Sequence, residues 1–254
     1  MAGNINPLSS LERNEPANDA KPEALVADAR QPWQRRTAGA LLIAGPMIFL
    51  LAEFIAAAAW TDPPYSYTYH FISNLGVHGP STLFGQYMYS PLAWVMNTGF
   101  FLFGIMILAG VAVLRGLLGW HRWAALVPAT LLAAGGVLLG LFPGSGEAMN
   151  DGTGDFHALG ALAGFVGANV LAIALGSMHR RVGLSLKLGR TLVTVGVIGL
   201  VSMVAYFADL ISGANVLVGL IERGAVHPFL LGLSCAGVAI WHGCSSVVTG
   251  LIKR

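Results

Sequence analysis

"AGALLIAGPMIFLLAEFIAAAAW", residues 38–60, decides the fold, because it is apolar throughout except for one ionisable side chain, Glu53. An α-helix rises about 1.5 Å per residue, so about twenty such residues cross a hydrocarbon core of roughly 30 Å. A backbone inside lipid must satisfy its own hydrogen bonds, and a helix does so within one segment. The stretch therefore predicts a transmembrane helix.

Five more runs of this kind follow, in a chain of 254 residues that is 55% hydrophobic and 10% charged. The mean hydropathy of +0.68 is far above that of a soluble domain. No segments of alternating hydrophobicity indicate a β-barrel. We therefore predict an all-α, six-helix transmembrane bundle. Its predicted spans cover residues 38–60, 92–114, 123–143, 157–178, 191–212 and 224–246.

The N-terminal segment differs in composition from the rest of the chain. Residues 1–36 are rich in Asn, Pro, Ala and mixed charge without apolar periodicity, so we expect a disordered cytoplasmic tail. A six-span membrane domain over residues 37–249 and a short cytoplasmic end over residues 250–254 complete the predicted organisation. The small residues before Trp60 resemble a signal-peptidase site, but the long apolar run favours a retained anchor.

The basic residues indicate how the chain is oriented. Of the fourteen Lys and Arg residues, all but Arg223 fall in the N-terminal tail, between spans 2 and 3, between spans 4 and 5, or at the C-terminus. By the positive-inside rule, these parts face the cytoplasm. We predict a multi-pass protein of the plasma (inner) membrane with both termini in the cytoplasm. The basic clusters lack interleaved aromatic residues, so we expect the lipid bilayer and no nucleic acid as a partner.

Acids and histidines collect on the opposite, outer side. Every acid outside the tail lies in an outer loop or in the outer part of a span, and four of the seven histidines join them. Their shared location predicts an outward-facing polar pocket. The candidate catalytic residues are Glu53, His70 and His157, and the candidate ligand-binding residues are Ser73, Asn74, Asp209, Glu222, Arg223 and His227.

Glu53 is the most informative of these residues. It lies seven residues before Trp60, about 10 Å below the outer end of its helix. A carboxylate at this depth costs about 2–3 kcal/mol on insertion scales, so we expect it to face the bundle interior and to have a partner. A functional interpretation pairs Glu53 with His70 or His157 for proton exchange or metal binding. A structural interpretation is a hydrogen bond between helices.

The other candidates allow structural interpretations as well. Glu222 and Arg223 flank the start of the last span and could pair with each other or with lipid headgroups. His227 precedes Pro228, as expected in the first turn of a helix, where proline loses no needed donor. Asp209 falls in the last turn of span 5.

The sequence contains no metal-binding motif with the usual spacing of its ligands. There is no H-E-x-x-H and no cysteine-pair site. A zinc centre built from His70, His157 and His227 with a carboxylate is chemically reasonable, because three nitrogen ligands and an open position make a hydrolytic site. The acids in the loop at 144–155 do not follow the calcium-loop template. The sequence thus names neither metal nor cofactor, and it does not indicate an oligomeric state.

Small residues predict one helix–helix contact. Gly136, Gly140 and Gly144 of span 3, and Gly160 and Gly164 of span 4, repeat every four residues. Such repeats let two helix backbones approach closely. We expect spans 3 and 4 to pack as an antiparallel hairpin along these glycines.

Three motifs carry a family resemblance: "YHFISNLGVHGP" at 69–80, "LFPGSGEAMNDGTGDFHALGALAGF" at 141–165 and "GLIER" at 219–223. With these motifs the chain resembles the DUF998 family of bacterial and archaeal membrane proteins. It is more distantly similar in layout to the Frag1, DRAM and Sfk1 membrane proteins. The matching positions are His70, Ser73, Asn74, Leu75, Gly76, Phe142, Pro143, His157, Glu222 and Arg223, and Asn74 stands where other members carry aspartate.

These observations lead to three hypotheses of function. In the first, the outer pocket binds or processes a lipid-like or small polar molecule, with Glu53 or His157 as general base and His70 as acid, base or metal ligand. Arg223 would then anchor a phosphate or carboxylate. The second is a proton-coupled small-molecule carrier in which Glu53 titrates. The third is a non-catalytic membrane scaffold.

Overall fold

The computed structural model describes the backbone of residues 22–252 and the side chains of residues 33–243. It is mostly helical, and six of its helices are long and apolar enough to cross a membrane, which confirms the predicted class and the number of spans. A disordered tail was expected over residues 1–36. Residues 1–21 lie outside the described part of the chain, and α1 is helical from Pro22. Of the end expected over residues 250–254, the last two residues lie outside the described part.

The elements follow each other in a simple up-and-down order with one elaborate connection, between α1 and α2. In chain order they are α1 (Pro22–Ala59), η1 (Ser73–Gly76), β1 (Ser81–Leu83), β2 (Gln86–Met88), α2 (Ala93–Val113), α3 (Trp120–Leu141), α4 (Gly146–Asp151), α5 (Gly154–Ser177), α6 (His179–Val182), α7 (Leu186–Ser212) and α8 (Val218–Ile252).

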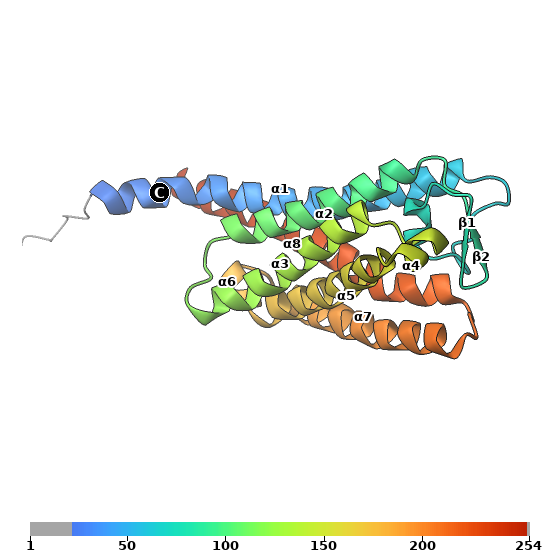
Figure 1. Ribbon diagram of the computed structural model, residues 1–254. Coiled ribbons are helices and arrows are strands. Elements are labelled where there is room, and N and C mark those ends of the chain that lie inside the picture. Colours follow the sequence, from blue (N-terminus) through green and yellow to red (C-terminus); the bar gives the residue numbers. More distant parts are fainter. Residues whose placement is uncertain (1–21, 253–254) are drawn as a thin grey trace, which may run out of the picture. The chain divides into compact units, whose positions relative to one another are not determined.

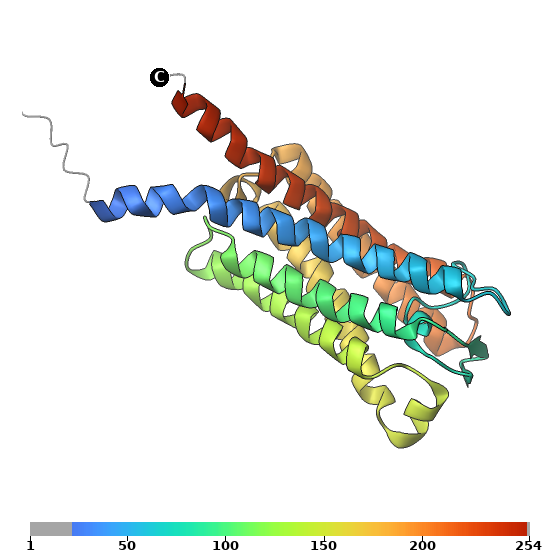
Figure 2. The ribbon, with the colours of Figure 1, turned by 90° about the horizontal axis from the view of Figure 1, so that it is seen from above.

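The six long helices form a ring in which each packs on its neighbours along the chain, and α8 returns to α1. α2 packs on α3, α3 on α5, α5 on α7, and α7 on α8. Where Gly39 of α1 meets Gly237 of α8, a Cβ on Gly39 would lie 2.7 Å from the Gly237 carbonyl oxygen, so the two backbones touch. Figures 1 and 2 show α1 lying between α2 and α8.

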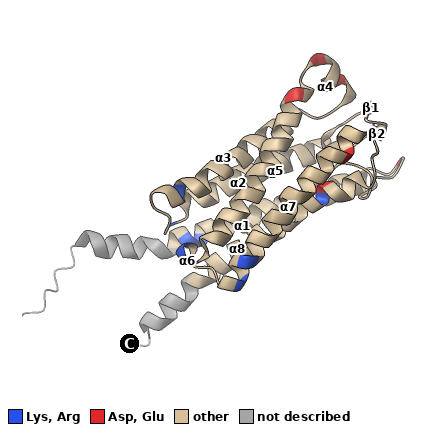
Figure 3. Cartoon of the chain, turned by 90° about the horizontal axis from the view of Figure 1, so that it is seen from below, with Lys and Arg blue, Asp and Glu red and all other residues tan. Residues whose placement is uncertain are grey.

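The two ends of the bundle differ in charge, as Figure 3 shows. We call the end with loops 60–92, 142–153 and 213–217 the acidic end. The opposite end, with loops 114–119 and 178–185, is the basic end, and none of the acids among residues 33–243 lies there. β1, β2 and α4 lie at the acidic end, and α6 at the basic end (Figure 1).

The connection over residues 60–92 contains a small hairpin that the sequence did not predict. β1 and β2 pair antiparallel, with Ser81 opposite Met88. The turn uses Phe84 and Gly85 at φ values of 50° and 75°. Two positive φ values suit the twist of a two-residue hairpin, although a non-glycine residue rarely adopts the first.

The last helix starts earlier than predicted. α8 begins at Val218 rather than at residue 224, so His227 lies well inside the helix and not in its first turn. The charged side chains of Glu222 and Arg223 interrupt the apolar run, so the predicted span starts after them. Both are buried instead, at 5% and 6% exposure, because the fold supplies partners for them.

The predicted glycine contact between the third and fourth spans exists, and Gly160 and Gly164 of α5 form it as expected, but their partner on α3 is Gly135. Gly135 of α3 faces α5, where an added Cβ would lie 2.5 Å from the Gly164 nitrogen and 2.7 Å from the Gly160 oxygen. Gly136 and Gly140 face α2 instead, against the carbonyl oxygens of Phe100 and Asn97. Consecutive helix residues differ by about 100° in direction, which separates Gly135 from Gly136.

We predict that Gly135→Ala lowers the free energy of unfolding by about 1–3 kcal/mol, because the methyl group would meet backbone that cannot move aside. Gly164→Ala is the matched control, since nothing lies within 4 Å of a Cβ at that position. Thermal unfolding of the purified protein in detergent measures both. Equal melting temperatures for the two variants would contradict the close packing of α3 on α5.

Candidate functional site

A buried ion pair joins α1 to α8 near the acidic end. Nε and Nη2 of Arg223 lie 3.0 and 2.9 Å from Oε1 of Glu53, and Nε2 of His227 lies 2.9 Å from Oε2. The Glu53 side chain is fully buried. Arg223 and His227 are four residues apart on α8, so both face Glu53. We call these three residues the clasp.

Arg223 also holds the connection between α1 and α2. Its Nη1 donates to the carbonyl oxygens of Tyr67, His70 and Gly219 at 2.8–3.2 Å, and its Nη2 donates to the Tyr65 hydroxyl at 2.5 Å. The guanidinium carbon lies 4.8 Å from the centre of the Tyr67 ring. Every nitrogen of Arg223 therefore has a partner within the protein.

Two aromatic side chains beside the clasp have shifted pKa values. Burial raises the pKa of the Tyr65 hydroxyl, against the opposing effect of Arg223. Burial and the nearby Arg223 charge both lower the pKa of His70. The His70 ring stacks on Trp60 at 5.1 Å and accepts a hydrogen bond from the Ser66 N–H at Nδ1, 3.0 Å away. A neutral, stacked imidazole of this kind shapes the loop.

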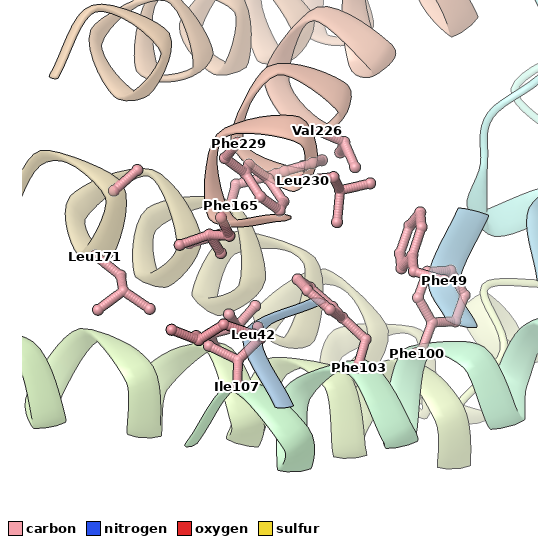
Figure 4. Close-up of a cluster of buried hydrophobic side chains, with 14 of the residues drawn as sticks. Leu42, Phe49, Phe100, Phe103, Ile107, Phe165, Leu171, Val226, Phe229 and Leu230 are labelled. Atoms are coloured by element: carbon pink, nitrogen blue, oxygen red, sulfur yellow. The ribbon is translucent and has the colours of Figure 1, made fainter. Parts of the chain in front are cut away.

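A cavity of about 190 Å³ lies in the bundle interior beside the clasp. Its walls are mostly aromatic and aliphatic, and Figure 4 shows several of these side chains, from α1, α2, α5 and α8. The stacked rings of Phe103 and Phe229, 6.1 Å apart, are among the wall residues. The phenylalanines that line it are Phe49, Phe71, Phe84, Phe100, Phe103, Phe165, Phe207 and Phe229.

A few polar groups line this apolar cavity. Glu222 is 5% exposed, and its Oε2 accepts a hydrogen bond from the Ile72 N–H at 2.5 Å. Tyr206 is 8% exposed, and its hydroxyl has no hydrogen-bond partner among the described residues. Ser73 and Asn74 line the same space from η1, and the Asn74 amide nitrogen donates to Gln86 Oε1 at 2.6 Å.

His157 and Asp155 line the cavity from the first turns of α5. Nδ1 of His157 lies 2.8 Å from the Phe142 carbonyl oxygen, which can only accept, so Nδ1 carries the proton and Nε2 keeps its lone pair. The neighbouring Gly144 has no space for a side chain, because a Cβ there would lie 2.7 Å from Nε2. Asp155 is exposed at the edge of the cavity, together with Phe84.

The structure therefore divides the predicted site residues into separate groups. Glu53, Arg223 and His227 form the clasp, whereas Ser73, Asn74, His157 and Glu222 line the cavity. His70 contacts Arg223 through its carbonyl oxygen only. Asp209 belongs to neither group, because its Oδ1 accepts a hydrogen bond from the Val216 N–H in the turn between α7 and α8.

The expected pairing of Glu53 needs a correction. Its histidine partner is His227 rather than His70 or His157, whose Nδ1 atoms bond Ser66 and Phe142. Among residues whose side chains are described, no three His, Cys, Asp or Glu residues are placed to hold a metal ion. The zinc centre considered from sequence is thus not assembled.

Glu147 lies apart from the clasp. Its carboxylate accepts a hydrogen bond from the Ser81 hydroxyl at 2.7 Å, which lowers the pKa of Glu147.

Sequence reasoning missed Tyr206 as a site residue. The only signal was a hydroxyl-bearing side chain inside an apolar span, three residues before Asp209. It also missed the phenylalanine walls, because phenylalanines in apolar spans look the same whether they face lipid or a cavity.

The fold and the site together define a multi-pass membrane protein whose helices enclose an apolar cavity with polar groups on its wall. The chain belongs to the family described as "Protein of unknown function (DUF998)", which it matches over residues 43–239. All nine candidate site residues lie within this range. No curated protein and no solved structure matches the chain.

We predict that Glu53→Gln and Arg223→Gln each lower the free energy of unfolding by about 3–5 kcal/mol, because each leaves one buried partner unsatisfied. The double variant should lose less than the sum, since it removes both charges together. Asp209→Asn is the control for changing a carboxylate at the same end. Unfolding in detergent measures all four variants, and strictly additive losses would contradict the coupling.

Proposed function

We propose that this protein binds an amphipathic, lipid-like molecule in the cavity beside the clasp. The observation that carries the proposal is the composition of the cavity wall: phenylalanines surround most of it, and Glu222, Tyr206, Ser73 and Asn74 add polar atoms. Ligand pockets are typically apolar with a few polar groups that fix orientation. An apolar chain would lie among the phenylalanines and a polar head beside Glu222.

The position of the cavity supports access from the membrane. Its edge includes the exposed side chains of Phe84, on the hairpin turn, and of Asp155, at the start of α5. Both lie at the acidic end, where polar headgroups would meet the bundle. An amphipathic molecule could enter there without its head crossing the hydrocarbon core, which would be costly for a charged group.

Binding fits the geometry better than transport or catalysis. Toward the basic end, the Phe103–Phe229 stack lies between α2 and α8, and Asn169 of α5 donates to the Ala225 oxygen of α8 at 3.1 Å. These contacts join helices across the bundle, which argues against a carrier path. Glu53, the general base considered from sequence, does not line the cavity and has both carboxylate oxygens bonded within the clasp.

We further propose that the acidic end faces outward from the plasma membrane and that both termini are cytoplasmic. The distribution of the basic residues supports this orientation by the positive-inside rule. It would place residues 37–249 as the membrane domain, with the tail at 1–36 and the end at 250–254 inside the cell.

Cysteine labelling tests the orientation. In a Cys235→Ala, Cys244→Ala background, Asp151→Cys at the acidic end should react with a membrane-impermeant maleimide in intact cells. Arg181→Cys at the basic end should react only after the cells are opened. The reverse pattern would contradict the proposed orientation.

A cavity-filling variant tests the binding. Ala161 lines the cavity, so Ala161→Trp should exclude a ligand. Ala205→Trp is the matched control, because Ala205 is exposed on α7 and lies outside the cavity. We expect native mass spectrometry of the purified protein to find a bound amphiphile in wild type and in Ala205→Trp, and at least tenfold less in Ala161→Trp. Equal occupancy in all three proteins, or none in any, would overturn the proposed function.

A further inference from the structure

Charge balance at the acidic end singles out Glu222. Glu53 and Arg223 neutralise each other in the clasp, where His227 contacts the second oxygen of Glu53. Glu222 is almost fully buried, but among the described residues it makes no ion pair. A buried carboxylate without a counter-ion is costly, and more so within a membrane. The cavity beside it is the space from which a counter-ion could come.

The polar side chains that line the cavity can all act as hydrogen-bond acceptors. The Ile72 N–H uses only Oε2 of Glu222, and Oε1 has no partner among the described residues. The Tyr206 hydroxyl is also unpartnered, although its side chain is more than nine-tenths buried. Further acceptors on the wall are the Ser73 hydroxyl, the Asn74 amide oxygen, Nε2 of His157 and the Asp155 carboxylate.

The charged donors that an anionic head would need are already used, and the Tyr206 and Ser73 hydroxyls can donate but carry no positive charge. All three nitrogens of Arg223 are bonded to Glu53, to Tyr65 and to backbone oxygens. The proton on Nδ1 of His157 is directed at the Phe142 carbonyl oxygen. A phosphate or carboxylate would therefore meet Glu222 and Asp155 without a compensating cation. The anchoring role considered for Arg223 is not available to a ligand in this cavity.

We propose that the ligand is an amphipathic amine: an apolar body whose ammonium group binds Glu222 and Tyr206. This inference rests on the proposed function and names its ligand class. An ammonium group carries three N–H donors and no acceptor, which matches the acceptors on the wall. A free amine fits better than an aminophospholipid, because the phosphate of the latter would lie at the cavity edge near Asp155.

Three eight-carbon probes test the charge of the head: octylamine, octan-1-ol and octanoate, titrated into the purified full-length protein with native mass spectrometry as readout. We expect wild type to bind octylamine at least tenfold more tightly than the other two, as for hydrogen bonds to charged groups. Glu222→Gln, which keeps an oxygen for the Ile72 N–H, should weaken octylamine binding enough to abolish this preference, whereas octanol binding should change less. Glu147→Gln is the matched control and should bind like wild type.

A second variant, Tyr206→Phe, tests the same proposal if Glu222→Gln does not fold. Tyr206→Phe should weaken octylamine binding by about threefold to tenfold, the effect of one hydrogen bond, with little effect on octanol. If octanol or octanoate binds wild type as tightly as octylamine, or if neither variant changes octylamine binding, the amine assignment is overturned. In that case, the proposed function stands if the probes bind wild type and Ala161→Trp removes their binding. If no probe binds any of these proteins, both proposals are overturned.

Discussion

The ion pair between Glu53 and Arg223 is the constraint on which the acidic end depends. A charged group inside a membrane is costly unless it has partners, and each of these residues supplies the other's. Arg223 has donors left over, which bind carbonyl oxygens of the connection between α1 and α2. One buried interaction thus joins α1, α8 and the connection between α1 and α2.

The cavity lies next to this joined region, and the loop forms part of its wall. The chain enters η1 at Ser73 directly after Ile72, whose N–H is held by Glu222. Ser73 and Asn74 therefore face the cavity because the residues before them are fixed to α8. α3 and α5 pack closely at Gly135, whereas the Cβ direction of Gly164, which lines the cavity, is open. At Gly164, the backbone of α5 therefore packs tightly on α3 while the Cβ direction opens toward the cavity.

Much of the fold follows from composition, whereas the site does so only in part. Apolar runs of sufficient length predict six helices, because lipid leaves the backbone no alternative. The predicted last span starts at residue 224, after the charged pair Glu222 and Arg223, and only the partners of these two residues explain why they are helical and buried. The depth of Glu53 correctly predicted that it would be partnered. The identity of that partner required the packing of α1 on α8.

The sequence by itself determined the number of membrane-spanning helices, the division into a basic and an acidic end, and the set of polar residues gathered at the latter. These features depend on hydrophobicity and charge, which each residue carries wherever it lies. Tertiary structure alone decided that Glu53 pairs with Arg223 and His227, that Glu222 and Tyr206 face one cavity, and that Asp209 lies apart. Such contacts depend on the rotation of each helix about its axis, which packing against its neighbours sets.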